Sequence, residues 1–250
     1  MAERLVIGVL GGMGPLATVD LYRKIIEATP AARDQEHLHV IIDADPSVPD
    51  RTDALLHGGP DPTPWLIAGA RRLAGAGASF IVVPCNTAHA FLPRVQAAVA
   101  VPFLNMIDET ADRLAEMLPA GSMIGILATA GTVASGLYHR ALAERGLRAI
   151  APPGDEQTLV SAAIAAVKAG QVERATSELV LGPALGLVRS GAQAVVAACT
   201  ELPLILRTGD LPVPLIDPTR VLAEAAVAVA LGQRPLPATP SKGLAYRHAE

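Results

Sequence analysis

The sequence predicts an α/β fold of two similar lobes, each a mostly parallel sheet flanked by helices. Short apolar runs alternate with longer segments rich in alanine and leucine that have helical periodicity, which is the pattern of βαβ units. The order of motifs in the first half of the chain also recurs in the second half, which indicates an internal repeat. We expect strands at residues 5–10, 38–44, 80–83, 103–104, 123–127, 147–150, 194–198 and 214–216, with helices between most of them.

Pairs of similar segments carry the repeat. VIGVLGGMG in the first half resembles MIGILATAG in the second, and VVPC resembles VAAC. The pairs follow the same order in both halves, although glycine and β-branched residues are common to all βα units and explain part of each match. The matched segments are 6–14 with 123–131, 21–22 with 137–138, 82–85 with 196–199, and 101–102 with 213–214.

The repeat predicts where the lobes divide and where a ligand binds. We expect the first lobe to hold residues 1–105 and 212–231, and the second to hold residues 106–211. Residues 232–250 contain three prolines and are expected to form a loose tail. Ligands of open α/β sheets bind at the carboxyl ends of the strands. Lobes related by a pseudo-twofold axis would therefore form an active site between them.

Composition excludes several classes of partner. Charged residues make up 18% of the chain, the net charge is −4 and no long run has one sign, which argues against nucleic acid. The first apolar run is interrupted by glycines, unlike a signal peptide, and the apolar stretch at 225–231 is too short to span a bilayer. Two cysteines are too few for a disulfide framework, so we expect a cytoplasmic protein with free thiols.

Two cysteines end the matching third strands of the two halves, Cys85 in the first and Cys199 in the second. A helix is predicted to start near each of them, with Thr200 as a candidate N-cap for the second. The unpaired N–H groups and dipole of a helix start favour an anion, so they lower the pKa of a nearby thiol from about 8.5. Either cysteine alone is ordinarily a small buried hydrophobe, but matching positions in matching halves favour an acid–base pair.

Other polar side chains lie near the same strand ends. Arg51 follows the second strand, where a guanidinium group can bind a carboxylate through two parallel hydrogen bonds, and Lys168 ends a predicted helix. Glu201 could hold an ammonium group. Local sequence explains these side chains equally well as surface charges or helix caps. Further amide and hydroxyl groups are offered by Asn86, Thr87 and Thr129.

A glycine-rich run after the first strand supports a competing interpretation. The run contains Gly12-x-Gly14, a weak dinucleotide pattern, and Asp43 or Asp45 could bind a ribose, as in a nicotinamide-dependent oxidoreductase. Pro15 in this run has no N–H to give a pyrophosphate, and the paired cysteines would stay unexplained. A non-catalytic, two-lobed amino-acid-binding protein is a third hypothesis, which explains the lobes but not the thiols.

No metal or cofactor site is expected. His37 and His39 share one strand face and His89 follows the first cysteine, yet no cluster of Cys and His with ligand spacing accompanies them. A pyridoxal enzyme would need a Schiff-base lysine, and neither Lys24 nor Lys168 lies in a context that marks such a site.

Three motifs, GGMGP at 11–15, PCNTAH at 84–89 and CTE at 199–201, resemble those of the aspartate/glutamate racemase family. PDRT at 49–52 and LATAGT at 127–132 are similar to the aspartate racemase branch in particular. The likeness extends from about residue 5 to about residue 231. It implies two α/β lobes with the active site between them, a small amino-acid substrate and usually a homodimer. Related branches act on glutamate, hydantoins or maleate, or decarboxylate arylmalonates.

The resemblance also implies roles for individual residues. Cys85 and Cys199 would be the acid and base of a cofactor-independent racemisation, with aspartate as the first substrate to expect and glutamate as the second. Ala198 stands where the family usually has glycine, so its methyl group is expected to narrow the site. The expected substrate-binding residues are Met13, Arg51, Asn86, Thr87, Thr129, Lys168, Thr200 and Glu201.

Overall fold

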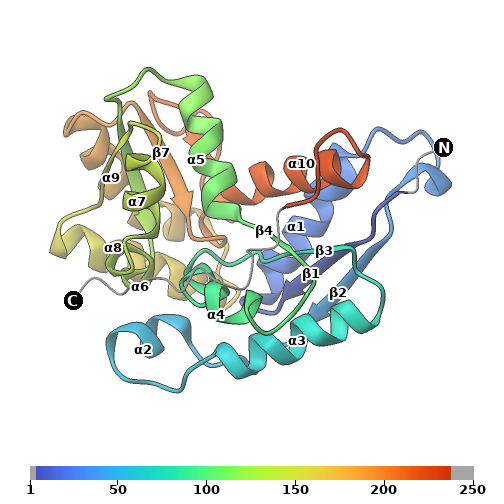
Figure 1. Cartoon of the computed structure of the whole chain (residues 1–250). Helices are drawn as coiled ribbons and strands as arrows, with labels where there is room; N and C mark the ends of the chain where they lie inside the picture. Colours follow the sequence, from blue (N-terminus) through green and yellow to red (C-terminus); the bar gives the residue numbers. More distant parts are fainter. Residues whose placement is uncertain (1–3, 238–250) are drawn as a thin grey trace.

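The computed structural model describes residues 4–237 as two lobes, each built on a four-stranded parallel sheet (Figure 1). The strand orders are β2-β1-β3-β4 in the first lobe and β6-β5-β7-β8 in the second. These orders are equivalent, so the expected α/β fold of two similar lobes is confirmed. The strands are β1 (Ile7–Gly11), β2 (Val40–Ala44), β3 (Phe80–Val82), β4 (Phe103–Leu104), β5 (Met123–Ala128), β6 (Arg148–Ile150), β7 (Ala194–Ala198) and β8 (Leu215–Ile216).

Helices and short 3-10 turns connect the strands and pack on the sheets (Figure 1). The first part of the chain forms α1 (Pro15–Ala28), η1 (Asp34–Glu36), α2 (Arg51–Leu56), α3 (Thr63–Gly75), η2 (Thr87–Ala90), α4 (Leu92–Gln96) and α5 (Met106–Met117). The later part forms α6 (Ala130–Ala134), α7 (Leu137–Ala143), α8 (Gly154–Lys168), α9 (Arg174–Arg189), η3 (Leu202–Leu204) and α10 (Pro218–Ala230).

The central strands are apolar throughout because helices cover both faces of each sheet. Every residue of β1 and of β7 is buried. On one face of the first sheet, Leu21 of α1 and Leu222 of α10 pack with Val9; on the other face, Leu66 of α3 packs with Leu10. This packing fixes the strand ends, where the functional loops begin.

The last strand and helix return the chain from the second lobe to the first. Strand β8 pairs with β7, so it belongs to the second sheet, whereas we expected residues 212–231 to lie in the first lobe. The reason is visible in the repeat: the Val-Pro pair at 213–214 corresponds to the pair before β4, and β8 is therefore the fourth strand of its own sheet. Helix α10, which follows, packs on α1 of the first lobe.

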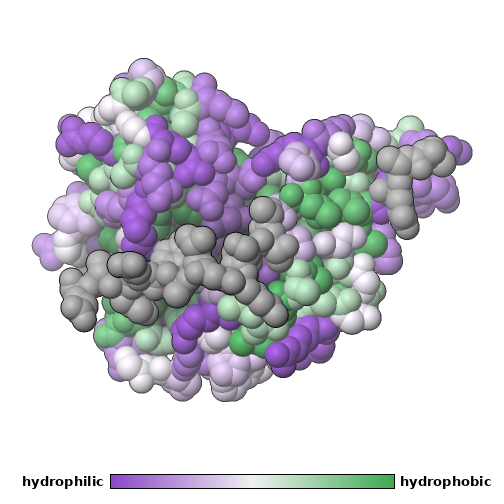
Figure 2. Space-filling model, viewed as in Figure 1, coloured by the Kyte–Doolittle hydropathy of each residue, from purple (hydrophilic) through white to green (hydrophobic). Residues whose placement is uncertain are grey.

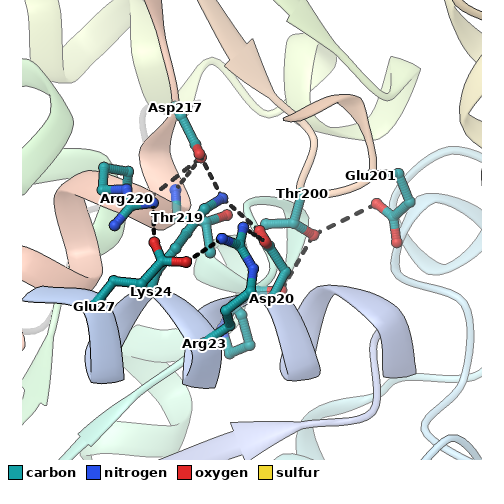
Figure 3. A network of polar contacts seen from close by, with 10 residues as sticks. Asp20, Arg23, Lys24, Glu27, Thr200, Glu201, Asp217, Thr219 and Arg220 are labelled. Carbon is teal, nitrogen blue, oxygen red and sulfur yellow. Dashed lines mark hydrogen bonds and ion pairs between the residues drawn. The ribbon is translucent and has the colours of Figure 1, made fainter. Parts of the chain in front are cut away.

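A buried ion cluster joins α1 to the start of α10 (Figure 3). Lys24 is 3% exposed and contacts both Asp20, one turn earlier in α1, and Asp217. Asp217 also caps α10, because its carboxylate accepts the N–H groups of Thr219 and Arg220. The cluster therefore holds the point at which the chain crosses between the lobes.

Residues 238–250 of the expected tail lie outside the described part of the chain. Across residues 4–237, every helix is too short or too polar to cross a membrane.

Candidate active site

One cavity between the lobes gathers the polar residues that the sequence singled out. It is narrow and partly open to solvent. The loops that line it follow the carboxyl ends of strands in both sheets, as ligand sites in parallel sheets do. All ten expected site residues line it, together with two that were not expected: Met13, Asp50, Arg51, Thr52, Cys85, Asn86, Thr87, Thr129, Lys168, Cys199, Thr200 and Glu201.

The two cysteines occupy equivalent places in the two lobes. Cys199 directly follows β7, Cys85 follows β3 after a short loop, and each is a free thiol with 6% of its surface exposed. Each precedes a 3-10 turn rather than an α-helix, so little macrodipole is available. The expectation of a lowered thiol pKa is wrong for Cys199: burial, and then the carboxylate of Glu201, raise its pKa well above the usual value.

The loop that carries Cys199 is fastened to the loop that carries Cys85. The Thr200 hydroxyl donates to the carbonyl oxygen of Pro84 at 3.2 Å, so it links the lobes rather than capping a helix as expected. The thiol of Cys199 donates to Oε2 of Glu201 at 2.9 Å. The contact between Thr200 and Pro84 could not be read from the sequence, because the two loops are far apart in the chain.

Cationic groups line the cavity from both lobes. Arg51 is the first residue of α2 and is buried; its Nη1 donates to the carbonyl oxygens of Val48 and Pro49, while its Nε has no partner among the described residues. Lys168 is the last residue of α8. Asp50 caps α2; burial alone would raise the pKa of its carboxyl, but the N–H donors of the helix start and these two cations lower it. The cavity can therefore bind anionic groups next to the thiols.

Amide and hydroxyl groups complete the lining. The Tyr138 hydroxyl donates to Oδ1 of Asn86 at 2.6 Å, and Nδ2 of Asn86 is buried without a partner in the described chain. Thr87 lies 3.0 Å from Thr129 and 2.8 Å from Thr132, measured between hydroxyl oxygens, so three hydroxyls join the lobes. We did not anticipate Thr132 or Tyr138, although Thr132 lies within the LATAGT motif.

The glycine-rich loop is shaped by contacts within the protein, which disfavours the dinucleotide interpretation. Gly12 has φ +90°, and a Cβ there would lie 2.4 Å from the backbone of Asp45. The N–H of Gly12 donates to the Thr18 hydroxyl, so it is not free for a phosphate. Asp43 is paired with Arg72 at 2.8 Å rather than free for a ribose.

The histidine considered as a metal ligand and the lysine considered as a cofactor-binding residue both make contacts within the protein. Nδ1–H of His89 donates to the carbonyl oxygen of Cys85 at 2.8 Å, and its Nε2 accepts the N–H of Met106 at 3.1 Å. Burial lowers the pKa of His89 to about 4, so the ring is a neutral support for the cysteine loop. No group of three metal-ligating side chains occurs between residues 4 and 237. The ammonium of Lys24 is held by two carboxylates.

Ala198 does not narrow the cavity as expected. It is fully buried and packs in the core of the second lobe, so its methyl group points away from the site. Successive side chains of a strand face opposite sides of the sheet, which separates Ala198 from Cys199.

Comparisons with known proteins agree with this geometry. Residues 10–226 match the family model described as Asp/Glu/Hydantoin racemase. The chain is 30% identical over 229 residues to the broad specificity amino-acid racemase RacX of Bacillus subtilis, which covers 90% of this chain and 98% of that protein. It is 32% identical over 152 residues to a glutamate racemase of Corynebacterium kroppenstedtii, 59% of this chain and 51% of that protein.

A solved structure shows the same arrangement of lobes. Picrophilus torridus aspartate racemase matches with a TM-score of 0.81 and 32% identity, over 90% of this chain and 94% of that chain. The family match covers the second sheet, the first sheet apart from the start of β1, and the loops that line the cavity. On this evidence the chain belongs to the Asp/Glu/hydantoin racemase family and is an isomerase of the amino-acid racemase class.

Proposed function

We propose that this protein racemises an acidic amino acid without a cofactor, with aspartate as the preferred substrate and Cys85 and Cys199 as its acid–base pair. The observation that carries the proposal is that one cysteine from each lobe lines a single cavity, together with the cations Arg51 and Lys168. Inversion at Cα needs a base on one face and an acid on the other. Equivalent positions in two pseudo-symmetric lobes supply such a pair.

The reaction consists of two proton transfers. One cysteine, as thiolate, takes the α-proton, and the electron pair of the broken C–H bond moves into the α-carboxylate to give an enediolate. The other cysteine, as thiol, gives its proton to the opposite face of Cα and is left as thiolate. For the other enantiomer the two cysteines exchange roles. Positioned acid and base groups contribute roughly 10²–10⁴-fold for each transfer.

Stabilisation of the enediolate is the harder requirement, because an amino-acid α-proton is very weakly acidic. Nε of Arg51 and Nδ2 of Asn86 are buried donors without partners in the described chain, and both residues line the cavity. Donors already fixed where charge develops stabilise it at little cost in reorganisation. Together with Lys168 they would hold the two carboxylates of aspartate.

The substrate range has two candidates besides aspartate. Glutamate is one methylene longer and carries the same charges, so it is the first alternative. A broader range, including neutral or basic amino acids, is the second. It is supported by the similarity to a broad specificity racemase along 98% of that protein's length.

The test is to incubate the pure protein separately with L-aspartate, L-glutamate, L-alanine and L-lysine, and to follow each on a chiral column. We expect D-aspartate to form without any addition, and Cys85→Ala protein serves as the blank. Formation of an oxo acid only with added nicotinamide cofactor would indicate an oxidoreductase. Tight binding without any conversion would indicate a binding protein, and faster turnover of lysine than aspartate would indicate the broad-range alternative.

We further propose that the protein is a homodimer, with α1 against α1 of a second copy. Four apolar side chains spaced three or four residues apart on α1 are 40–65% exposed: Leu16, Val19, Tyr22 and Ile26. Figure 2 shows hydrophobic surface on the first lobe, over the region that α1 occupies in Figure 1. In a dimer with a twofold axis, this apolar face of α1 packs against the same face of the second copy. Both faces are then removed from water.

Sedimentation equilibrium tests this interface. Val19→Glu should shift the protein from dimer to monomer. Leu159→Glu, which changes an isolated exposed leucine on α8, should leave the dimer intact. A dimer that persists in Val19→Glu would exclude this face of α1.

We place the protein in the cytoplasm for a chemical reason. The proposed mechanism needs both thiols reduced, and the two cysteines are free in the structure. The cytoplasm keeps thiols reduced, whereas an oxidising compartment promotes disulfides. Fractionation of cells followed by detection of the protein tests this placement.

A further inference from the structure

The two cysteines occupy equivalent positions but have unequal neighbours. Two residues after Cys199 stands Glu201, whose Oε2 accepts the thiol proton at 2.9 Å. Two residues after Cys85 stands Thr87, whose hydroxyl contacts the hydroxyls of other threonines instead. The two lobes repeat each other in fold but differ in chemistry at the candidate active site. Cys199 has a carboxylate two residues later, whereas Cys85 has a hydroxyl.

The carboxylate of Glu201 is an unusual buried group. The residue is 3% exposed, and across residues 4–237 the structure shows no ion pair for it. Its other contact is the Thr200 hydroxyl, 3.4 Å from Oε2. Oε1 lies against Gly14, where a Cβ would approach to 3.2 Å, so the glycine leaves room for this carboxylate. A buried carboxylate needs donors, and the thiol of Cys199 is its nearest one.

An ionised carboxylate only accepts hydrogen bonds, so the contact requires a proton on the sulfur. Loss of that proton would leave two negative charges about one hydrogen-bond length apart in a buried place. Burial and Glu201 both raise the pKa of Cys199, whereas Lys168 acts in the opposite direction. The other charged side chains that line this cavity are Arg51, the first residue of α2, and Asp50, which caps that helix.

From this geometry we infer that Glu201 is a positioning residue that keeps Cys199 protonated in the free enzyme, so that Cys85 is the base of the resting state. The consequence of this role for catalysis rests on the proposed racemase function. The test does not, because it is made on protein without substrate. The resting enzyme would accept the enantiomer whose Cα–H faces Cys85. After that turnover Cys85 carries the proton taken from substrate and Cys199 is a thiolate beside Glu201. One proton lost by Cys85 to water and one gained by Cys199 restore the resting state, with no net change.

This role differs from the ammonium ligand that the sequence suggested for Glu201. An ammonium ligand acts on the substrate and would leave the titration of the free thiol unchanged. A thiol partner sets that titration in the absence of substrate. The two roles can therefore be separated with substrate-free protein.

The experiment uses the fact that the chain has two cysteines. In Cys85→Ala protein labelled with ¹³Cβ-cysteine, a single resonance reports Cys199, and its chemical shift is followed against pH. A second substitution in the same protein, Glu201→Gln, keeps the shape of the side chain but removes its charge. It should move the midpoint of the Cys199 titration to lower pH, because the negative charge that disfavours the thiolate is gone. Glu201→Asp keeps the charge and should retain more of the raised midpoint, which gives a second variant if the first does not fold.

Glu224→Gln is the matched control, since this carboxylate lies on α10 and pairs with Arg113. It should leave the Cys199 midpoint in place. A midpoint that is unchanged or higher in folded Glu201→Gln protein overturns the inference. Because the titration is done without substrate, a protein that fails to racemise any amino acid but shows the shift would contradict the proposed function and support the pairing of thiol and carboxylate.

Discussion

His89 makes stability depend on pH in a way that can be calculated. Burial lowers its pKa from 6.5 to about 4 in the folded protein. The unfolded chain therefore binds a proton more readily, and the stability that the neutral ring contributes is complete above pH ~6.5 and is lost as the pH falls toward ~4. At about 1.4 kcal/mol per pKa unit, the loss is about 2 kcal/mol by pH ~5 and about 3 kcal/mol in full.

Urea denaturation of the protein and of a His89→Gln variant, at several pH values from about 7.5 to about 4.5, measures this loss. Carboxylates that titrate in the same range affect both proteins alike, so the difference between them isolates the histidine. The variant should be less stable near neutral pH but should lose about 2 kcal/mol less by pH ~5. His57→Gln, at an exposed position, should follow the unaltered protein. Equal dependence on pH in His89→Gln and in the unaltered protein would refute the reasoning.

The remaining predictions concern turnover and the crossing between lobes. Cys85→Ala and Cys199→Ala should each nearly abolish racemisation on the chiral column while circular dichroism stays unchanged; full activity in either would remove the two-cysteine assignment. Arg51→Leu should reduce aspartate turnover strongly, because it removes a buried cation from the cavity, and alanine should be a poor substrate of the unaltered protein; equal rates on both amino acids would exclude a side-chain carboxylate clamp. In D₂O, D-aspartate formed early from L-aspartate should be almost fully deuterated at Cα by mass spectrometry, and substantial protium from both directions would point to a single base. Lys24→Met should lower the free energy of unfolding by about 3–5 kcal/mol, since two carboxylates lose their partner, whereas the exposed Arg23→Met should cost about 1 kcal/mol or less.

The sequence pattern was enough to predict features that depend on residues close together in the chain. The run AVVAA was predicted as a buried strand from its unbroken apolar character, and it forms β7. The two cysteines were placed at matching strand ends because the repeat preserves their order. β8 was found as a strand but expected in the wrong lobe, because the sheet that a strand joins depends on hydrogen bonds to a partner, here β7.

The chemistry around the cysteines depended on tertiary structure. The sequence shows Glu201 near Cys199, but burial and the direction of its carboxylate make it a thiol partner rather than a surface charge. Tyr138 reaches Asn86 across 52 residues of chain.

The sequence by itself therefore determined the elements, their repetition and the placement of the two cysteines after matching strands, because these follow from periodicity and residue order over a few neighbouring positions. Only the tertiary structure decided which groups are buried, which are paired and which, among residues 4–237, keep a donor without a partner. Lys24 and Asp217, which meet across 193 residues, illustrate the reason: contact and burial depend on how the two lobes pack, and that packing sets the electrostatic environment of each side chain.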